Sequence, residues 1–320
     1  MIHRLWRPIR QYRVAWGFLL PAILGMFLVH FLPLVQLVGI SFLDSRRTNL
    51  GLGLSAPAVG EGTGILGNYV SILSEKSDPF HLGLMDAVWN TCIFTVVVTL
   101  SSFLLGLLGA LLLEKVGRGR GFWQALLVAP WIVPAYVVGL VWGVFWQQDS
   151  GVVNQTLHAV GLLGEDHSTW PMWLSGSLTR WALILPAVWR EWPYALLLFS
   201  LGLQAIPPQI HEAAKLDGAG GWLRFKKITM PLLTPAASLV LLHGVVYNVY
   251  SFNLPLMMFG AGSGNGGKQG DLLMPTIFRN TFQRWDFGRG AAATVVLMVV
   301  MLFLVALWYR VFRSDLEKLR

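Results

Sequence analysis

Residues 212–235 read EAAKLDGAGGWLRFKKITMPLLTP, a charged and glycine-broken stretch that lies between two strongly apolar stretches of the chain. The two prolines at 207–208 can open a helix, because the first N–H groups of a helix have no partner to lose. The Asp-Gly pair at 217–218 ends that helix, since glycine accepts the backbone of a tight turn. The pattern predicts a second short helix over 222–228, closed by Pro231. We therefore expect two short helices at an angle, held off the membrane by prolines at each end.

This stretch has the composition of a docking surface for a soluble partner. The small side chains of Ala213, Ala214 and Ala219 would let the backbone of another protein approach closely. The alternative is an amphipathic helix that lies on anionic lipid, which Lys226 and Lys227 would suit. A face of small residues does not serve that purpose, so the sequence favours docking.

The rest of the chain has the composition of a membrane protein. Of its 320 residues 55% are apolar and 12% are charged, and the mean hydropathy is +0.58, which lies outside the soluble range. A helix of ~20 residues crosses a hydrocarbon core of ~30 Å, and backbone groups in lipid must find partners within the protein. We therefore predict an all-α membrane protein, a six-transmembrane-helix bundle in one domain over 14–312, with its first helix bent at Pro33. The six helices are expected near 14–43, 88–113, 122–146, 181–204, 232–254 and 290–309.

Charged residues are distributed as a bilayer requires. All 40 of them except Arg190 and Glu191 lie outside the six predicted spans. The side that would carry both termini and the loop at 205–231 holds 15 Lys and Arg residues, and the other side holds 8. We therefore expect the basic N-terminus (1–13), this loop and the tail (313–320) to be cytoplasmic.

Several short motifs follow one another along the chain in an order that matches a known family. Besides the stretch quoted above, they are Gly67-Asn68-Tyr69, Asn90-Thr91, Pro130, Pro134, Gly151, Asn154, the run Trp189 to Pro193, and the run Trp285 to Gly288. Together they resemble the binding-protein-dependent ABC importer permeases of the maltose and glycerol-phosphate type, specifically their first, longer permease subunit. The similarity runs from about Leu19 to Arg310, and the stretch at 212–235 corresponds to the EAA loop of that family.

The resemblance implies a type I importer permease fold and a division of labour among subunits. It implies that the EAA loop inserts into a cleft of an ATP-binding subunit and transmits the closure of that subunit to the membrane helices. The implied partners are a second, homologous permease subunit in a heterodimer, two ATP-binding subunits, an extracytoplasmic solute-binding protein and a sugar-like substrate, in a bacterial or archaeal cytoplasmic membrane. The residues carried over to ATPase coupling are Glu212, Ala213, Ala214, Asp217, Gly218 and Pro231.

Two departures from the family leave the particular sugar or polyol open. The family's extracytoplasmic Thr-x-Gly-Gly-Pro element is here the glycine-rich run 260–264, which has neither Thr nor Pro. The large outer domain of some maltose-type subunits is missing, because the longest outer loop covers only about 44–87.

The sequence shows no machinery for chemistry of its own. The loop at 262–269 fits a phosphate-binding pattern in its letters, but Gln269 stands where Ser or Thr would hold magnesium. The seven histidines have no metal-ligand spacing, and no serine lies in a G-x-S-x-G motif. The basic residues lie beside the predicted spans and not on a face with stacking aromatics. We expect no catalytic residue, metal site, cofactor or nucleic-acid binding, and we expect ATP hydrolysis to come from another chain.

Two groups of polar residues lie inside predicted spans, where ionisable side chains suggest function. Arg190 and Glu191 point about 100° apart on a helix, so each is expected to face the bundle interior or the partner permease, in structural pairing or in substrate contact. In the fifth span, polar and aromatic side chains share one face, which suits a hydroxyl-rich ligand and equally suits hydrogen bonding between helices. That face comprises His243, Tyr247, Tyr250 and Ser251, with Asn248 and Asn253 beside it. The candidate substrate path is Tyr247, Asn248, Tyr250, Ser251, Asn253, Arg190 and Glu191.

Two other classes of protein compete with this interpretation. An ion-coupled secondary transporter of a small polar solute would predict inverted internal repeats and unpaired carboxylates at mid-membrane, where Glu191 is the one carboxylate. An intramembrane enzyme would need a nucleophile and a base, which the sequence does not offer. The leading hypothesis is a permease subunit that forms half of the translocation path for a sugar or related polyol, driven by a separate ATPase.

Overall fold

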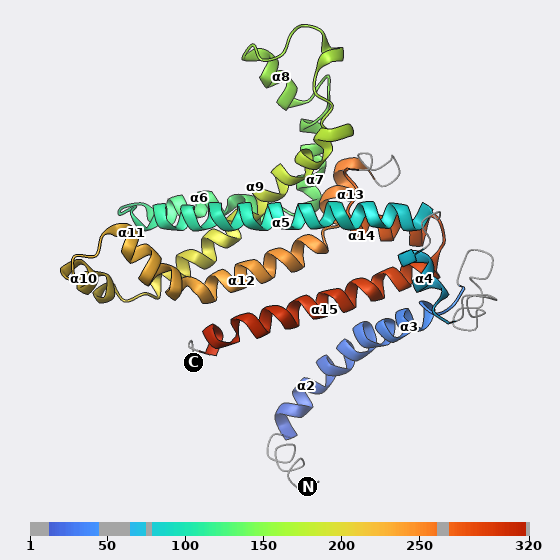
Figure 1. The fold of residues 1–320 in the computed structure, drawn as a ribbon, viewed down its shortest axis with the longest axis horizontal. Coiled ribbons are helices and arrows are strands. Elements are labelled where there is room, and N and C mark those ends of the chain that lie inside the picture. The colour runs from blue at the N-terminus through green and yellow to red at the C-terminus, as the bar shows by residue number, and fades with distance from the viewer. Residues whose placement is uncertain (1–12, 45–64, 75–78, 261–268, 318–320) are drawn as a thin grey trace. The chain divides into compact units, whose positions relative to one another are not determined.

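The computed structural model describes residues 13–44, 65–74, 79–260 and 269–317, and within these ranges the chain consists of helices and connecting turns (Figure 1). Five helices are long and apolar enough to cross a membrane, and a bent pair of helices supplies a sixth span if the pair counts as one. The prediction of an all-α membrane protein is thereby confirmed. The helices form two compact units, described in turn below.

The first unit contains the N-terminal helices and residues 278–299. The motif at 67–69 holds the end of the first helix: Asn68 Nδ2 donates to the carbonyls of Ser41 (2.9 Å) and Leu43 (3.0 Å), and the Tyr69 hydroxyl lies 2.6 Å from Ser41 Oγ. The elements are α2 (Arg13–Met26), the π turn η1 (Phe27–Phe31), α3 (Leu32–Ile40), α4 (Gly67–Ser74), the π turn η6 (Arg279–Gln283) and the first part of α15 (Phe287–Glu317).

The second unit contains residues 82–277 and the last part of α15. Its buried side chains include a cluster around Phe94, Leu183 and Leu254 and another around Leu107 and Phe199. The elements are α5 (Pro79–Glu114), α6 (Arg120–Ile132), α7 (Ala135–Phe145), α8 (Val152–Ala159), η3 (His167–Thr169), η4 (Gly176–Leu178), α9 (Thr179–Gln204), α10 (Pro208–Leu216), α11 (Gly221–Arg224), the π turn η5 (Phe225–Thr229), α12 (Met230–Val249), α13 (Asn253–Phe259) and α14 (Leu273–Phe278).

The third predicted span, 122–146, is not one helix. Helices α6 and α7 meet at an angle of 84°. Val133, which precedes Pro134, has extended backbone angles (φ −66°, ψ 126°), as a residue before proline prefers. The prediction of a single helix here was wrong because a proline in an apolar run does not reveal whether the helix continues, and here the extended backbone of Val133 ends α6.

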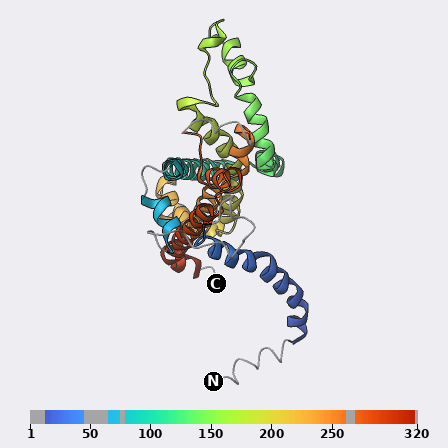
Figure 2. The ribbon, with the colours of Figure 1, turned by 90° about the vertical axis from the view of Figure 1, so that its right-hand side faces the viewer.

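Two other prolines are absorbed without a break. Pro33 and Pro231 each occupy the second position of a helix that follows a π turn directly. In each turn the residue before the proline, Leu32 or Met230, donates its N–H five residues back, and this wider turn makes room for the ring. The first helix therefore runs on past Pro33 along a curved path, drawn in blue in Figure 2.

The π turn before Pro231 also makes the prediction for the EAA loop wrong in one respect. Its second short helix does not end at Pro231, because α11, η5 and α12 follow one another without a gap and form one helix of 29 residues, Gly221–Val249. The expected first helix and the turn at Gly218 are present. The predicted pair of isolated short helices is therefore one short helix, α10, joined to the end of a long one.

Residues 147–178 extend away from the rest of the second unit, at the top of both views (Figures 1 and 2). Asn154 is fully buried there and donates to the carbonyls of Gln148 (2.9 Å) and Pro171 (3.0 Å), while Trp173 Nε1 donates to its side-chain oxygen (2.7 Å). Position 151, the first of the two motif residues Gly151 and Asn154, requires glycine because a Cβ there would overlap the carbonyl of Gln147. The two motif residues thus have structural tasks.

The close approach of α5 and α9 gives a test of packing. A Cβ on Gly106 would overlap the Ala195 side chain and lie 2.7 Å from the Leu196 nitrogen, whereas a Cβ on Gly83, in the same helix, meets nothing within 4 Å. Gly106→Ala should therefore destabilise the protein by about 1–3 kcal/mol through overpacking. Gly83→Ala should stabilise it by about 0.5–1 kcal/mol, as alanine usually does in a helix. Thermal unfolding of the two purified variants measures both signs, and equal shifts in the same direction would contradict the packing described here.

Candidate functional site

The polar residues predicted in the fourth and fifth spans meet in the structure. Arg190 and Glu191 lie on α9, and Tyr247 and Asn248 lie at the end of α12. Each residue of one pair bonds to one residue of the other, so the two candidate groups form one cluster inside the second unit. We call these four residues the polar node.

Arg190 joins three segments. Its Nε donates to the Val133 carbonyl (3.0 Å) and its Nη1 donates to the Tyr247 hydroxyl (2.7 Å), while its guanidinium carbon lies 5.4 Å from the centre of the Tyr247 ring. The Val133 carbonyl lies at the break between α6 and α7, where the N–H groups of Val137 and Val138 both donate to Pro134 instead. Arg190 thus supplies the donor that the interrupted helix does not.

Glu191 and Asn248 make the other half of the node. Asn248 Nδ2 donates to Glu191 Oε2 (3.0 Å) and approaches Thr99 Oγ1 on α5 (3.4 Å). Asn248 is fully buried and Glu191 is 7% exposed. Gly244, one turn before Asn248, has no room for a side chain because a Cβ would overlap Thr99. These contacts join α5, α9 and α12 through polar side chains. Hydrogen bonds between polar side chains commonly hold helices together in lipid.

A column of aromatic rings leads away from the node. Tyr247 lies parallel to His243 at 5.5 Å between ring centres, His243 stacks on Tyr194 at 4.0 Å, and Tyr194 lies 5.7 Å from Trp131. The column combines residues of α12, α9 and α6. Ring faces next to hydroxyl and imidazole groups are the surfaces that cover and hydrogen-bond a sugar ring.

Three members of the predicted path lie apart from this face. Helix α12 ends at Val249, so Tyr250 and Ser251 belong to the turn that follows, and Asn253 begins α13. The expected span to 254 was therefore too long by about one turn, and the prediction of one continuous face through Ser251 was wrong. Tyr250 and Asn253 are exposed.

The EAA loop forms a second candidate site. Helix α10 ends in a Schellman motif: Ala219 N–H donates to the Ala214 carbonyl (2.9 Å) and Gly218 N–H donates to Lys215 (3.0 Å). Gly218 has φ +77°, which glycine adopts without strain. The geometry fixes the direction in which the chain leaves α10.

The surface of this loop is exposed and mixed in character. Glu212, Ala213, Asp217, Gly218 and Pro231 are exposed and Ala214 is half-buried. Large apolar side chains are exposed among them, with Leu216 at 90% and Trp222 at 74%. Exposed apolar side chains between charged ones are typical of a protein-binding surface.

Within the residues that the structure describes, no group of three or more His, Cys, Asp or Glu residues could hold a metal ion. The lone Cys92 is exposed on α5. The glycine-rich loop with the phosphate-binding letters lies mostly at 261–268, outside the described residues.

The chain matches a known family of transport proteins. Residues 102–318 match the model of the family described as binding-protein-dependent transport system inner membrane component. The chain belongs to this family. It is a permease of the ABC importer type, as the resemblance implied, and not a secondary transporter.

Relatives and solved structures agree with the assignment. The permease is 32% identical to the sn-glycerol-3-phosphate transport system permease protein UgpA of Agrobacterium fabrum, over 81% of this chain and 82% of the relative. It is 29% identical to the sulfoquinovosyl glycerol transport system permease protein SmoG of the same organism, over 97% and 93%. Its fold is similar to a chain of a bacterial ABC transporter involved in the import of the acidic polysaccharide alginate (TM-score 0.78, 20% identity, covering 97% and 99%).

Sequence reasoning missed several members of the site. Thr99 gave no signal, because a threonine in an apolar helix is common. Tyr194 lies four residues after Arg190 and so on the same face of α9, and this spacing was a usable signal. The Val133 carbonyl is a backbone group that becomes available only because Pro134 breaks the helix, which the sequence pattern does not show.

The bond between Arg190 and Tyr247 can be measured by a double-mutant cycle. Arg190→Met and Tyr247→Phe should each lower the free energy of unfolding, and together they should lower it less than the sum of the two. The expected coupling energy is about 0.5–3 kcal/mol, as for residues in direct contact.

Tyr250→Phe serves as the matched control, because Tyr250 is exposed and its change should be about 0.5 kcal/mol or less. Thermal unfolding of the purified permease and its variants gives all the values. Additive effects of Arg190→Met and Tyr247→Phe would show that the two side chains are not coupled.

Proposed function

We propose that the permease forms half of the translocation path for a sugar or related polyol, and that a separate ATPase drives it through the EAA loop. One observation carries the proposal: the second part of the exposed loop and two residues of the polar node, Tyr247 and Asn248, lie on the same helix. Gly221–Val249 has 29 residues, or about 43 Å at 1.5 Å per residue. One end begins three residues after Gly218, and the other carries Tyr247 and Asn248.

A displacement of α10 would reach this helix through the turn at 217–220 and would then pass to the node along one continuous helix. At the node, Tyr247 bonds to Arg190, and Arg190 bonds to the carbonyl at the break between α6 and α7. We infer that the break is the element that moves when an ATPase closes on α10. Such a chain of hydrogen bonds with a broken helix at its end is a physical route for coupling.

The substrate class is inferred from the site and from the relatives. The named solutes of UgpA and SmoG, sn-glycerol-3-phosphate and sulfoquinovosyl glycerol, both carry hydroxyl groups. The aromatic column and the polar residues near the end of α12 offer ring faces, amides and hydroxyls, which recognise such groups. We propose Tyr250, Ser251 and Asn253 as further contacts along the path.

The proposed assembly contains this permease and a second, homologous permease as a heterodimer, two ATP-binding subunits and an extracytoplasmic solute-binding protein. Both termini and the EAA loop would be cytoplasmic, following the excess of Lys and Arg on that side. The permease itself would have no catalytic activity. Glu212, Ala213, Ala214, Asp217, Gly218 and Pro231 would form its contact with the ATPase.

The coupling role can be tested at one glycine of the loop. Gly218→Val places a β-branched residue at φ +77°, which is strained for any L side chain, so α10 should leave its docking position. In the transporter reconstituted with its own partners, substrate-stimulated ATP hydrolysis and uptake should fall together.

Gly220→Val is the matched control, because Gly220 has φ −64° and open space around its Cβ. It should retain both activities, and both variants should insert in the membrane as the wild type does. A Gly218→Val transporter with wild-type uptake, or a tagged permease that never co-purifies with a soluble ATPase, would refute the proposed coupling.

The substrate path can be tested where the side chains have no structural duty. Asn253→Ala and Tyr250→Phe change exposed residues at the start of α13 and just after α12, so the melting temperature should not change. Loss of a hydrogen bond to a bound solute costs about 1–3 kcal/mol, so uptake at low substrate concentration should fall roughly five- to 150-fold. Arg190→Met, by contrast, should lower both uptake and the melting temperature. Unchanged uptake in Asn253→Ala and Tyr250→Phe would move the path elsewhere.

A further inference from the structure

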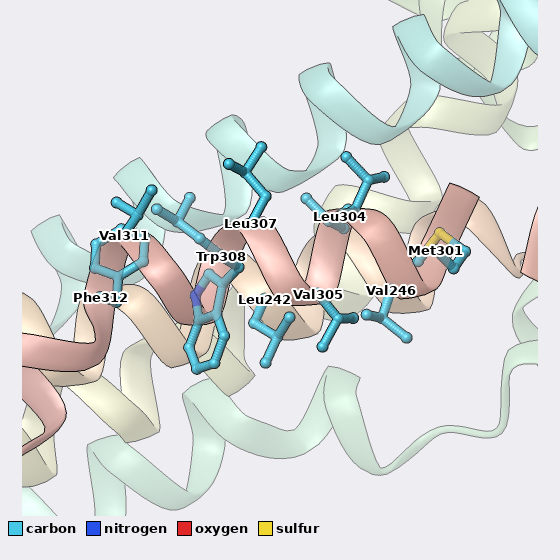
Figure 3. Close-up of a pocket in the computed structure, with 11 residues that line it drawn as sticks. Leu242, Val246, Met301, Leu304, Val305, Leu307, Trp308, Val311 and Phe312 are labelled. Atoms are coloured by element: carbon cyan, nitrogen blue, oxygen red, sulfur yellow. The ribbon is translucent and has the colours of Figure 1, made fainter. Parts of the chain in front are cut away.

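An apolar groove lies along the line where α12 and the last part of α15 cross (Figure 3). Its volume is about 250 Å³ and it is open along one side. Its walls are made by aliphatic and aromatic side chains throughout. The lining residues include Leu241 and Val246 of α12 and Met301, Val305, Trp308 and Phe312 of α15.

The two helices are fixed to each other at the groove. Trp308 Nε1 donates to the Ser238 carbonyl (2.9 Å), so the polar atom of the indole is satisfied and its ring is left to form part of the wall. Met301 is almost fully buried. The groove is therefore a formed feature of the two helices.

The lining favours a hydrocarbon chain. Water in a buried site needs two to four polar partners, and this groove offers none among its lining residues. No Gly, Ala, Ser or Thr lines the groove either, so it lacks the small residues that let two transmembrane helices approach closely. A thin, flexible hydrocarbon chain suits such a lining.

Positive charge lies beyond one end of the groove on the α12 side, because Lys226 and Lys227 precede the lining residue Leu241 by 15 and 14 residues, or about 21 to 23 Å along the helix. Counting back along the helix at 100° per residue, and at about 80° across the π turn η5, places Lys226 and Lys227 about 10° and 95° from Leu241. The groove-lining residues of α12 span about 140° from the same origin, so both exposed lysines fall on the groove face. This end of α12 lies at the same side as the C-terminal end of α15 (Figure 1).

We propose that this groove binds one acyl chain of an anionic phospholipid, whose phosphate lies at Lys226 and Lys227. The apolar lining takes the chain, and the lysines attract the headgroup, each contributing as basic residues near a membrane surface do. The proposal does not rest on the transport activity proposed above.

The proposal is tested with the purified transporter in nanodiscs and a phosphatidylglycerol that carries a photoactivatable group in one acyl chain. After irradiation, peptide mass mapping should find adducts concentrated on residues 241–246 and 301–312. Lys226→Gln and Lys227→Gln should each lower this labelling roughly fivefold, and photoactivatable phosphatidylcholine should label the wild type as weakly as the double variant.

Matched controls lie on the same helix. Val305→Trp fills the groove and should abolish labelling, whereas Leu302→Trp on the exposed side of α15 should not. Arg310 points about 160° away from Trp308, so Arg310→Gln should leave labelling unchanged. If Val305→Trp does not fold, unlabelled phosphatidylglycerol can be added to the wild type instead, and it should reduce the labelling of the groove by competition. Equal labelling by the two lipids would overturn the proposal. Labelling that is seen on the isolated chain and lost in the assembled transporter would also overturn it, because a partner chain would then cover the groove.

Discussion

The constraint on which this structure depends is the lack of water for backbone groups inside a bilayer. A proline removes one donor and pushes against a carbonyl one turn earlier, and in lipid that carbonyl needs a new partner. Three prolines show two solutions. At Pro33 and Pro231 a π turn keeps the helix continuous, and at Pro134 the helix breaks and Arg190 donates to the Val133 carbonyl at the break. Pro186, Pro193 and Pro235 lie inside helices that continue past them.

The choice of an arginine at this point has a physical reason. Its planar group presents several donors at fixed angles, so it can bond to Val133 and Tyr247 at once and still lie near the Tyr247 ring. A charged side chain inside a membrane costs free energy, and hydrogen bonds to several partners offset that cost. Glu191 is the next residue, yet it bonds to Asn248 on α12. The two adjacent charges thus bind two adjacent residues of the other helix, which fixes the rotation of α12 against α9.

The sequence predicted the helical class and the position of most spans, because charge and periodicity report directly on burial in lipid. It also singled out Arg190, Glu191, Tyr247 and Asn248, which the structure brings together, and their role in transport stays a prediction. It did not predict how prolines are accommodated. Pro33, Pro134 and Pro231 look alike as letters, and only their neighbours in space decide between a π turn and a break. The expected end of the fifth span at 254 failed for a related reason, because apolar residues continue past Val249 although the helix does not. The role of the EAA residues stays a prediction.

The π turn at 225–229 has a consequence for how such permeases can be recombined. One residue more or fewer in this turn would rotate everything before it by about 100° relative to α12. The angle at which α10 is presented therefore depends on the residue count of a segment inside the long helix as well as on the turn at Gly218. A chimera that exchanges only residues 208–220 would inherit the recipient's angle, so an exchange of coupling specificity between two permeases has to carry the helix up to Pro231 with it.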